Sequence, residues 1–347
     1  MIEITTSRAN ELVDPYLHVW AWQIPVYLFL GGLVAGMMVL GGLNMLRLAK
    51  GRRLDEAWPV QTPLLAFVLL NLGMGALFLD LEHKLYVWAV YLTFQPASPM
   101  SWGSWVLILV FPVLLVSALI RLPQAWPWLG ENVPALGRAS DWLLRRPAVI
   151  RWLGVLNVGL GIGLGIYTGI LLNTMVARPL WNTAILGPLF LFSGLSAAAA
   201  LVHLVSGLMR SPAPRTMLGG ALSALAQPLT ATAPDHRNAA ALTRADVAFL
   251  AVELVLIVLM FIGLTSSSAS HIAAAQLLIT GPYAAVFWVG VVAIGILIPL
   301  LLQLLELSQR VRHTAIPALL VLAGGITLRW VMVSAGQVSH LVASAAN

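Results

Sequence analysis

Cysteine is absent from this chain of 347 residues. The protein therefore cannot build a disulfide, a thiolate zinc site or an iron–sulfur cluster from its own side chains. Charge is scarce as well: 9% of the residues are Asp, Glu, Lys or Arg, whereas soluble domains carry about 25%, and 60% are apolar. These shortages indicate an integral membrane protein, in which electron transfer would need another subunit or a bound organic cofactor.

We expect no secretory leader at the start of this sequence. Residues 1–19 have no basic stretch of the kind that opens a signal peptide, and they contain Glu3, Glu11 and Asp14. We expect them to form a segment outside the membrane. The net charge of +6 does not indicate nucleic-acid binding, because the basic residues lie in short loops beside apolar segments.

Long apolar segments dominate what is present. Each has at least the roughly 20 residues that cross a hydrocarbon core of about 30 Å. They cover residues 20–48, 61–80, 102–121, 150–172, 180–209, 243–266, 281–304 and 315–340. The expected fold class is therefore an all-α integral membrane protein with eight transmembrane helices. Residues 210–242 are expected to be a cytoplasmic linker, and the aromatic loop 81–101 to include a short interfacial helix.

The basic residues fall almost entirely on alternate connections. Fifteen follow the first, third, fifth and seventh segments: Arg47, Lys50, Arg52, Arg53, Arg121, Arg138, Arg145, Arg146, Arg151, Arg210, Arg215, Arg237, Arg244, Arg310 and Arg312. The other connections and termini carry Arg8, Lys84 and Arg178, and Arg329 lies within the eighth segment. Because cytoplasmic loops are enriched in Lys and Arg, this pattern places both termini on the non-cytoplasmic side.

Small residues recur at four-residue spacing in the first and fourth segments. The first contains Gly32 and Gly36, and the fourth contains Gly161, Gly165 and Gly169. This spacing lets helices approach closely. It indicates either tight bundling alone or close packing that shapes a flat ligand pocket.

Three ionisable residues lie within the predicted spans and need a partner or a role. Glu253 and Arg329 lie at similar, roughly central depths, and a buried pair would neutralise both. Asp246 precedes Glu253 by seven residues and shares its helical face. The pattern is typical of a fixed ion pair or of a step on a proton path.

Other polar residues gather at the predicted outer rim. Asp80 ends the second segment and is followed by Glu82 and His83, a pattern that fits a solvated helix end or a proton-exchange site. Of the seven histidines, only His203 lies well inside a span, where we expect it to be hydrogen-bonded within the bundle. A bis-histidine haem needs two inward histidines at matching depth, so no haem is expected.

Three stretches together resemble the NrfD-like family, which includes the membrane subunit of polysulfide reductase. The first is WAWQIPVYLFLGGLVAG from Trp20 to Gly36. The second joins Asp80-Leu-Glu-His83 with SPMSWGSW at residues 98–105, and the third joins YTGILL at 167–172 with PLWN at 179–182 and SGLS at 193–196. The resemblance runs over all eight segments and ends with Arg329-Trp330 and Gly336-Gln337.

The resemblance implies a quinone-binding anchor in a bacterial or archaeal cytoplasmic membrane. Such a subunit binds menaquinone or ubiquinone near its outer face, where a peripheral iron–sulfur subunit docks, itself usually bound to a molybdopterin catalytic subunit. It carries no haem and no cluster of its own. The family arrangement implies two four-helix bundles, with the quinone-binding bundle in residues 20–172 and the second in 173–347.

The family's site residues transfer position by position. A first-helix histidine that faces the quinone is replaced by Tyr27, which follows Trp22 and Gln23 in the same motif, while the fourth-helix tyrosine is matched by Tyr167. A tyrosine hydroxyl can still donate a hydrogen bond to a quinone carbonyl. These four residues are the expected quinone contacts.

The remaining family positions concern protons. Asp80, with Glu82 or His83, is expected to exchange protons at the quinone site. Glu253 and Arg329 match polar positions associated with proton transfer in the family, with Asp246 nearer the cytoplasm.

The expected function is exchange of electrons between the iron–sulfur subunit and the quinone pool, with proton translocation as an added possibility. The direction of electron flow stays open. Two alternatives remain: a transporter without a redox role, whose site would lie near the midplane, and a purely structural anchor.

Overall fold

The computed structural model describes residues 20–51, 58–125, 130, 132–208, 236–311 and 314–341. Regular secondary structure in these ranges is entirely helical, and eight helices are long and apolar enough to cross a bilayer. The predicted fold class is thus confirmed, and the chain is a multi-pass membrane protein. The expected outer segment 1–19 and most of the linker 210–242 lie outside the described residues.

Eight spanning helices follow the predicted apolar runs. They are α1 (Gln23–Ala49), α2 (Trp58–Asp80), α4 (Pro99–Ala125), α7 (Pro147–Asn173), α8 (Leu186–Leu208), α10 (His236–Thr265), a π-helical segment (Val286–Leu297) continued by α12 (Ile298–Leu307), and α13 (Ile316–Gln337). Proline stands in the first turn of α7 and α13, where its missing N–H costs nothing.

Short helices occupy several connections between the spans. The short helix expected in loop 81–101 is present as α3 (Val87–Leu92), preceded by the 3₁₀ turn η1 (Lys84–Tyr86). Two others, α6 (Pro134–Leu144) and α11 (Ala269–Ile279), were not predicted. The π-helical geometry of residues 286–297 was not predicted either; there Gly295 meets the backbone of Gly324 in α13.

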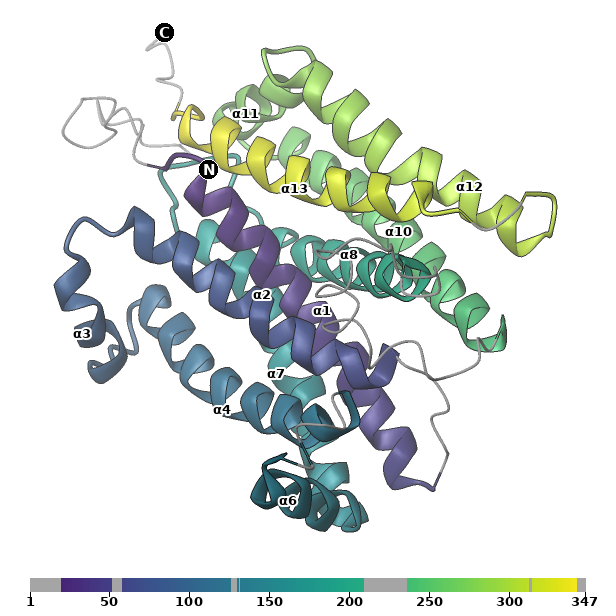
Figure 1. Cartoon of the computed structure of the whole chain (residues 1–347). Helices are drawn as coiled ribbons and strands as arrows, with labels where there is room; N and C mark the ends of the chain where they lie inside the picture. The colour runs from purple at the N-terminus through teal and green to yellow at the C-terminus, as the bar shows by residue number, and fades with distance from the viewer. Residues whose placement is uncertain are drawn as a thin grey trace, which may run out of the picture.

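Helix α1 lies at the centre of the molecule (Figure 1). In the most apolar window of α1, 72% of the residues are buried, compared with 28% for α10. Its neighbours are α2, α7, α8 and α13. Because α1 packs against helices from both halves of the chain, the division into two four-helix bundles stays a prediction.

Glycines allow the closest helix crossings. A Cβ atom on Gly36 of α1 would overlap the carbonyl oxygen of Gly194 in α8, and one on Gly194 would overlap that of Gly32. A Cβ on Gly161 of α7 would lie 2.7 Å from the carbonyl oxygen of Ala35 in α1. The small residues of α1 therefore face α8 as well as α7, and the close packing predicted from their spacing extends over three helices.

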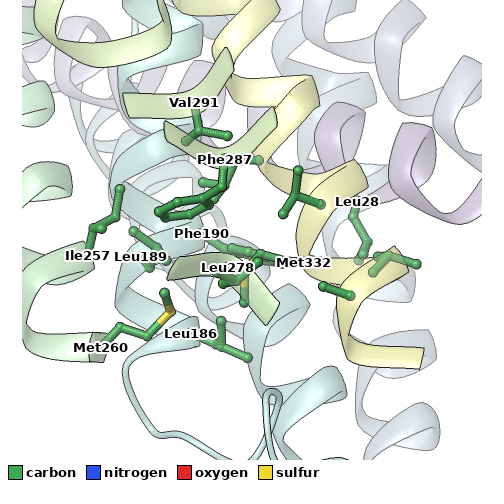
Figure 2. Packing of buried hydrophobic residues seen from close by; sticks show 14 of the residues in the cluster. Leu28, Leu186, Leu189, Phe190, Ile257, Met260, Leu278, Phe287, Val291 and Met332 are labelled. Carbon is green, nitrogen blue, oxygen red and sulfur yellow. The ribbon is translucent and has the colours of Figure 1, made fainter. Parts of the chain in front are cut away.

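A core of apolar side chains lies on the α13 side of α1. Figure 2 shows Phe190 of α8 packed among Leu189, Phe287 and Met332. These side chains come from α8, the π-helical segment and α13, and they are fully buried. Helices from the second half of the chain are thereby fixed against α1.

The start of α1 is fastened to the last turn of α13. The backbone N–H of Trp20 donates to Oε1 of Gln337, and Nε2 of Gln337 donates to the carbonyl oxygen of Trp20, both at 3.0 Å. Trp20 also packs on Trp181, with ring centroids 5.4 Å apart. We call the end of the molecule where α1 begins and α13 ends the rim.

The loop between α7 and α8 completes this fastening. Trp181 is fully buried and its Nε1 donates to the carbonyl oxygen of Met332 at 2.7 Å, beside Gly336, where a Cβ would overlap the indole nitrogen. Arg178 donates to the carbonyl oxygen of Ser339 at 3.1 Å. The turns that carry these two residues explain why α8 begins at Leu186 and not at residue 180.

Candidate functional site

Three tyrosines gather at the rim. Tyr27 lies in the second turn of α1 and Tyr167 near the end of α7, and only 8% and 7% of their surfaces are exposed. Tyr27 is close enough to interact electrostatically with both Tyr167 and Tyr91, which lies on α3. The structure therefore brings together the two tyrosines that the sequence singled out and adds a third that it did not.

Residue 103 determines where the Tyr167 hydroxyl lies. The hydroxyl forms a hydrogen bond with the backbone of Gly103 in α4. A Cβ atom on Gly103 would overlap that hydroxyl and the adjacent ring carbons. Glycine is thus required here for a close approach between a side chain and a helix backbone.

Tyr91 differs from the other two tyrosines because it belongs to a segment between spans. It is half-buried against the apolar cluster that contains Leu33 and Leu107. Partial burial raises the pKa of Tyr91 above its ordinary value. No sequence signal separated it from its neighbours, because loop 81–101 is rich in aromatic residues that resemble membrane-interface residues.

The two other predicted quinone contacts, Gln23 and Trp22, differ in burial. Gln23, at the first position of α1, has a buried Oε1 atom without a hydrogen-bond partner among the described residues. An unsatisfied buried acceptor is costly unless a ligand or water supplies a donor. Trp22 is 57% exposed, as suits a residue that faces lipid or the interface. Of the pair, Gln23 is the better candidate for a polar contact.

The predicted proton-exchange residues lie at the same end of the molecule. Asp80 is the last residue of α2 and is partly buried, whereas Glu82 and His83 follow in the connection to η1 and are exposed. The connection continues into α3, which carries Tyr91. Few residues of the chain therefore separate Tyr91 from the exposed Glu82 and His83.

Glu253 and Arg329 are brought together deep within the bundle, as predicted. They are 4% and 1% exposed and interact electrostatically. Ser193 of α8 lies between them: it is hydrogen-bonded to Glu253 and accepts a hydrogen bond from Nη1 of Arg329. Nη2 of Arg329 donates to the carbonyl oxygen of Phe190 at 2.9 Å. Helix α8 thus contacts both charged side chains, which come from α10 and α13.

Asp246 lies seven residues before Glu253 on the same helix, α10. Its two carboxylate oxygens accept hydrogen bonds from Ser196 of α8 and Gln303 of α12, each at 2.6 Å. Ser193 and Ser196 are three residues apart and share a face of α8. Ser196 contacts Asp246 and Ser193 contacts Glu253, so the two serines lie between the two acids.

Beyond Asp246, a small cavity lies among α8, α10, α12 and α13, at the end of the molecule opposite the rim. Its polar lining includes Asp246, His203, Gln303 and Glu306, and it has room for about one water molecule. Oε1 of Gln303 is buried without a partner among the described residues. His203, expected to be a hydrogen-bonded residue of the bundle, lines this cavity. Sequence reasoning missed Gln303 and Glu306 because both lie near a helix end, where polar residues are common.

The described residues contain no group of three or more His, Asp or Glu side chains that could hold a metal ion. Two sets of hydrogen-bonding groups include predicted site residues. One is the tyrosine cluster at the rim, defined as Tyr27, Tyr91 and Tyr167. The other is the polar ladder, defined as Arg329, Ser193, Glu253, Ser196, Asp246 and Gln303.

Comparison with known proteins gives concordant matches along the whole chain. The family model described as "Polysulphide reductase, NrfD" matches residues 10–217 and 216–341. The sequence is 32% identical over 334 residues to one of the chains of polysulfide reductase from Wolinella succinogenes, covering 92% of this protein and 94% of that one. It is 27% identical over 334 residues to protein NrfD of Escherichia coli, covering 92% and 96%. A more distant relative is one of the subunits of selenate reductase from Mesobacillus selenatarsenatis, at 22% over 343 residues, covering 90% and 73%.

Proposed function

The chain belongs to the polysulphide reductase NrfD family, and we propose that it is the quinone-reactive membrane subunit of an oxidoreductase complex. Two of its relatives are named as components of reductases, of polysulfide and of selenate. The observation that carries the proposal is that Tyr27 and Tyr167 are both buried at one end of the bundle and interact electrostatically there. Buried hydroxyls in an apolar wall are an arrangement that suits an apolar ring with polar oxygens.

The residues present fit a quinone head group. Tyrosine hydroxyls donate hydrogen bonds to carbonyl oxygens, and the unpartnered Oε1 of Gln23 accepts one from a hydroxyl. Bound menaquinone or ubiquinone supplies two-electron, two-proton chemistry. Tyr27 and Tyr167 hold the ring oxygens, and Gln23 favours the reduced form because only that form has a proton to donate.

Protons leave or arrive through the end of α2. Asp80 is partly buried and Glu82 and His83 are exposed, so the three groups lead from the rim of the bundle toward water. We place the electron-donating or electron-accepting iron–sulfur subunit, with its molybdopterin partner, over the same rim. There its cluster lies closest to the tyrosine cluster. The alternating charge pattern of the loops supports assigning the rim to the non-cytoplasmic face.

Replacing Tyr167 and Asp80 tests this assignment. Tyr167→Phe and Asp80→Asn should each lower quinone-linked turnover of the purified complex while dye-linked activity of the soluble partners stays unchanged. One hydrogen bond is worth about 0.5–1.5 kcal/mol, hence roughly two- to tenfold in kcat/KM for Tyr167→Phe. Tyr86→Phe is a matched control, because Tyr86 is 66% exposed in the neighbouring connection. Wild-type quinone-linked rates in both site variants would refute the quinone site.

The polar ladder supports proton translocation as a second part of the function. Ionisable residues within a membrane are expensive and commonly mark ion pathways. Here Asp246 and Glu253 stand seven residues apart, about 10 Å along α10 at 1.5 Å per residue, and the serines of α8 fill the interval. The cavity beside Asp246 lies toward the end opposite the rim and has room for about one water molecule. The ladder thus leads from that end to mid-depth.

Proton uptake into vesicles tests the ladder. Glu253→Gln should abolish uptake coupled to quinone turnover in reconstituted complex while assembly is retained. Asp141→Asn is the control, because Asp141 is an exposed acid on α6. Loss of assembly without a proton defect in the assembled fraction would favour a fixed ion pair. Uptake that proceeds without any quinone would instead favour the transporter alternative.

A further inference from the structure

The connection between α2 and α4 is held in a defined position by side chains of α4. Oγ of Ser104 shares its proton between the carbonyl oxygens of Ser101, at 2.8 Å, and Val90, at 3.0 Å. Oγ of Ser101 donates to the carbonyl oxygen of Thr93 at 3.2 Å and accepts from the backbone N–H of Gln95 at 2.9 Å. These bonds satisfy backbone groups that a short helix leaves without internal partners.

Two tryptophans of α4 extend this contact. Nε1 of Trp102 donates to the carbonyl oxygen of Pro96 at 2.7 Å. Trp105 packs edge-on against Phe94, with ring centroids 5.2 Å apart. Together Ser101, Trp102, Ser104 and Trp105 form what we call the α4 clamp. Every residue of the motif 101–105 except Gly103 therefore fixes the segment 90–96.

Tyr91 lies between Val90 and Thr93, whose carbonyl oxygens are hydrogen-bonded to α4, and its side chain faces the bundle. Its neighbours Val90 and Leu92 are 38% and 74% exposed, whereas Tyr91 packs on the apolar cluster beside α1 and α4. It also lies within electrostatic reach of Tyr27. The remaining motif residue, Gly103, admits the Tyr167 hydroxyl. A single stretch of five residues in α4 thus positions two of the three tyrosines.

We propose that Tyr91 is a third hydroxyl contact of the quinone head group and that the α4 clamp positions it over the Tyr27–Tyr167 pair. The proposal rests on the quinone site proposed above. A quinone has two carbonyl oxygens, each with two lone pairs, so three donors can be accommodated without competition. Tyr91 lies on a segment outside the spans, so it contributes to head-group affinity from the aqueous side of the pair.

The test uses the whole complex and two readouts. Tyr91→Phe should raise the KM for quinone by roughly two- to tenfold, as expected for one lost hydrogen bond. The kcat should change less, and the quinone that co-purifies with the complex, measured after extraction, should fall. Tyr86→Phe is the matched control in the same connection and should leave both readouts at wild-type values.

A clamp variant tests the positioning role. Ser104→Ala removes the bond to the carbonyl oxygen of Val90 and should raise the KM in the same direction as Tyr91→Phe. The double variant should resemble Tyr91→Phe alone, because the clamp acts through Tyr91. Fully additive effects would overturn the positioning role of the clamp.

The outcomes separate this inference from the proposed function. Wild-type KM and quinone content in Tyr91→Phe, together with losses in Tyr167→Phe, would overturn the third contact and leave the quinone site standing. Wild-type values in both Tyr91→Phe and Tyr167→Phe would refute the site itself. If Tyr91→Phe fails to assemble, a photoreactive quinone can be used on the unmodified complex. Labelling within residues 84–98 is expected, and labelling confined to other segments would overturn the proposal.

Discussion

A methyl group at residue 103 should displace the Tyr167 phenol, because a Cβ there would occupy the position of the hydroxyl and of the ring carbon that bears it. The neighbouring helix cannot absorb the overlap easily, since the contact is between a ring and a helix backbone. Overpacking of this kind costs about 1–3 kcal/mol. Loss of the hydrogen bond between Tyr167 and Gly103 adds about 1 kcal/mol. The expected total is roughly 2–4 kcal/mol.

Part of this free energy should appear as lost quinone affinity and part as lost stability. Gly103→Ala should therefore lower quinone-linked kcat/KM at least as far as Tyr167→Phe, and it should lower the Tm of the purified subunit in detergent. The two substitutions should be non-additive in kcat/KM, because both remove the same hydroxyl from the same position. Steady-state kinetics with a short-chain quinone and a thermal melt measure both effects.

Gly163→Ala is the matched control for this substitution. Gly163 lies on α7, the helix of Tyr167, and a Cβ there would meet nothing within 4 Å. It should leave quinone kinetics unchanged and should not lower the Tm. If Gly103→Ala behaves like this control, the Tyr167 hydroxyl does not lie where the structure places it, and the reasoning for the tyrosine cluster fails.

Two further substitutions probe other contacts. Gly336→Ala should lower the Tm by forcing the buried Trp181 indole from its place at the rim, with its effect visible as a faster loss of the folded subunit on heating; an unchanged melt would contradict the contact. Ser193→Ala should reduce stability by about 1–3 kcal/mol, because it leaves the buried Glu253 and Arg329 without their shared hydroxyl. Vesicle assays of this variant should show slower proton uptake, and wild-type uptake would exclude Ser193 from the proposed path.

The spans could be predicted from the sequence because a bilayer imposes length and hydropathy on each of them. The pairing of Glu253 with Arg329 was also predictable, since two buried charges at similar depth need each other. Ser193, which joins them, was not predictable as a bridge. A serine in an apolar helix carries no sign of which neighbour it will meet.

Contacts with backbone atoms limited the prediction of the site. The Tyr27–Tyr167 approach was expected from the family positions, whereas Tyr91 was one aromatic among several in its loop. Its selection depends on Ser101 and Ser104, whose partners are backbone groups that have no sequence signature. The role of Gly103 likewise depends on a helix approach that only the fold reveals.

The mutual hydrogen bonds of Trp20 and Gln337 join residues separated by 317 positions. In the described part of the protein, the first spanning helix is thereby held by the last. During synthesis, the start of α1 acquires this partner only after the eighth span has entered the membrane. A polypeptide that stops before α13 therefore lacks the residue that binds the backbone of Trp20 at the rim.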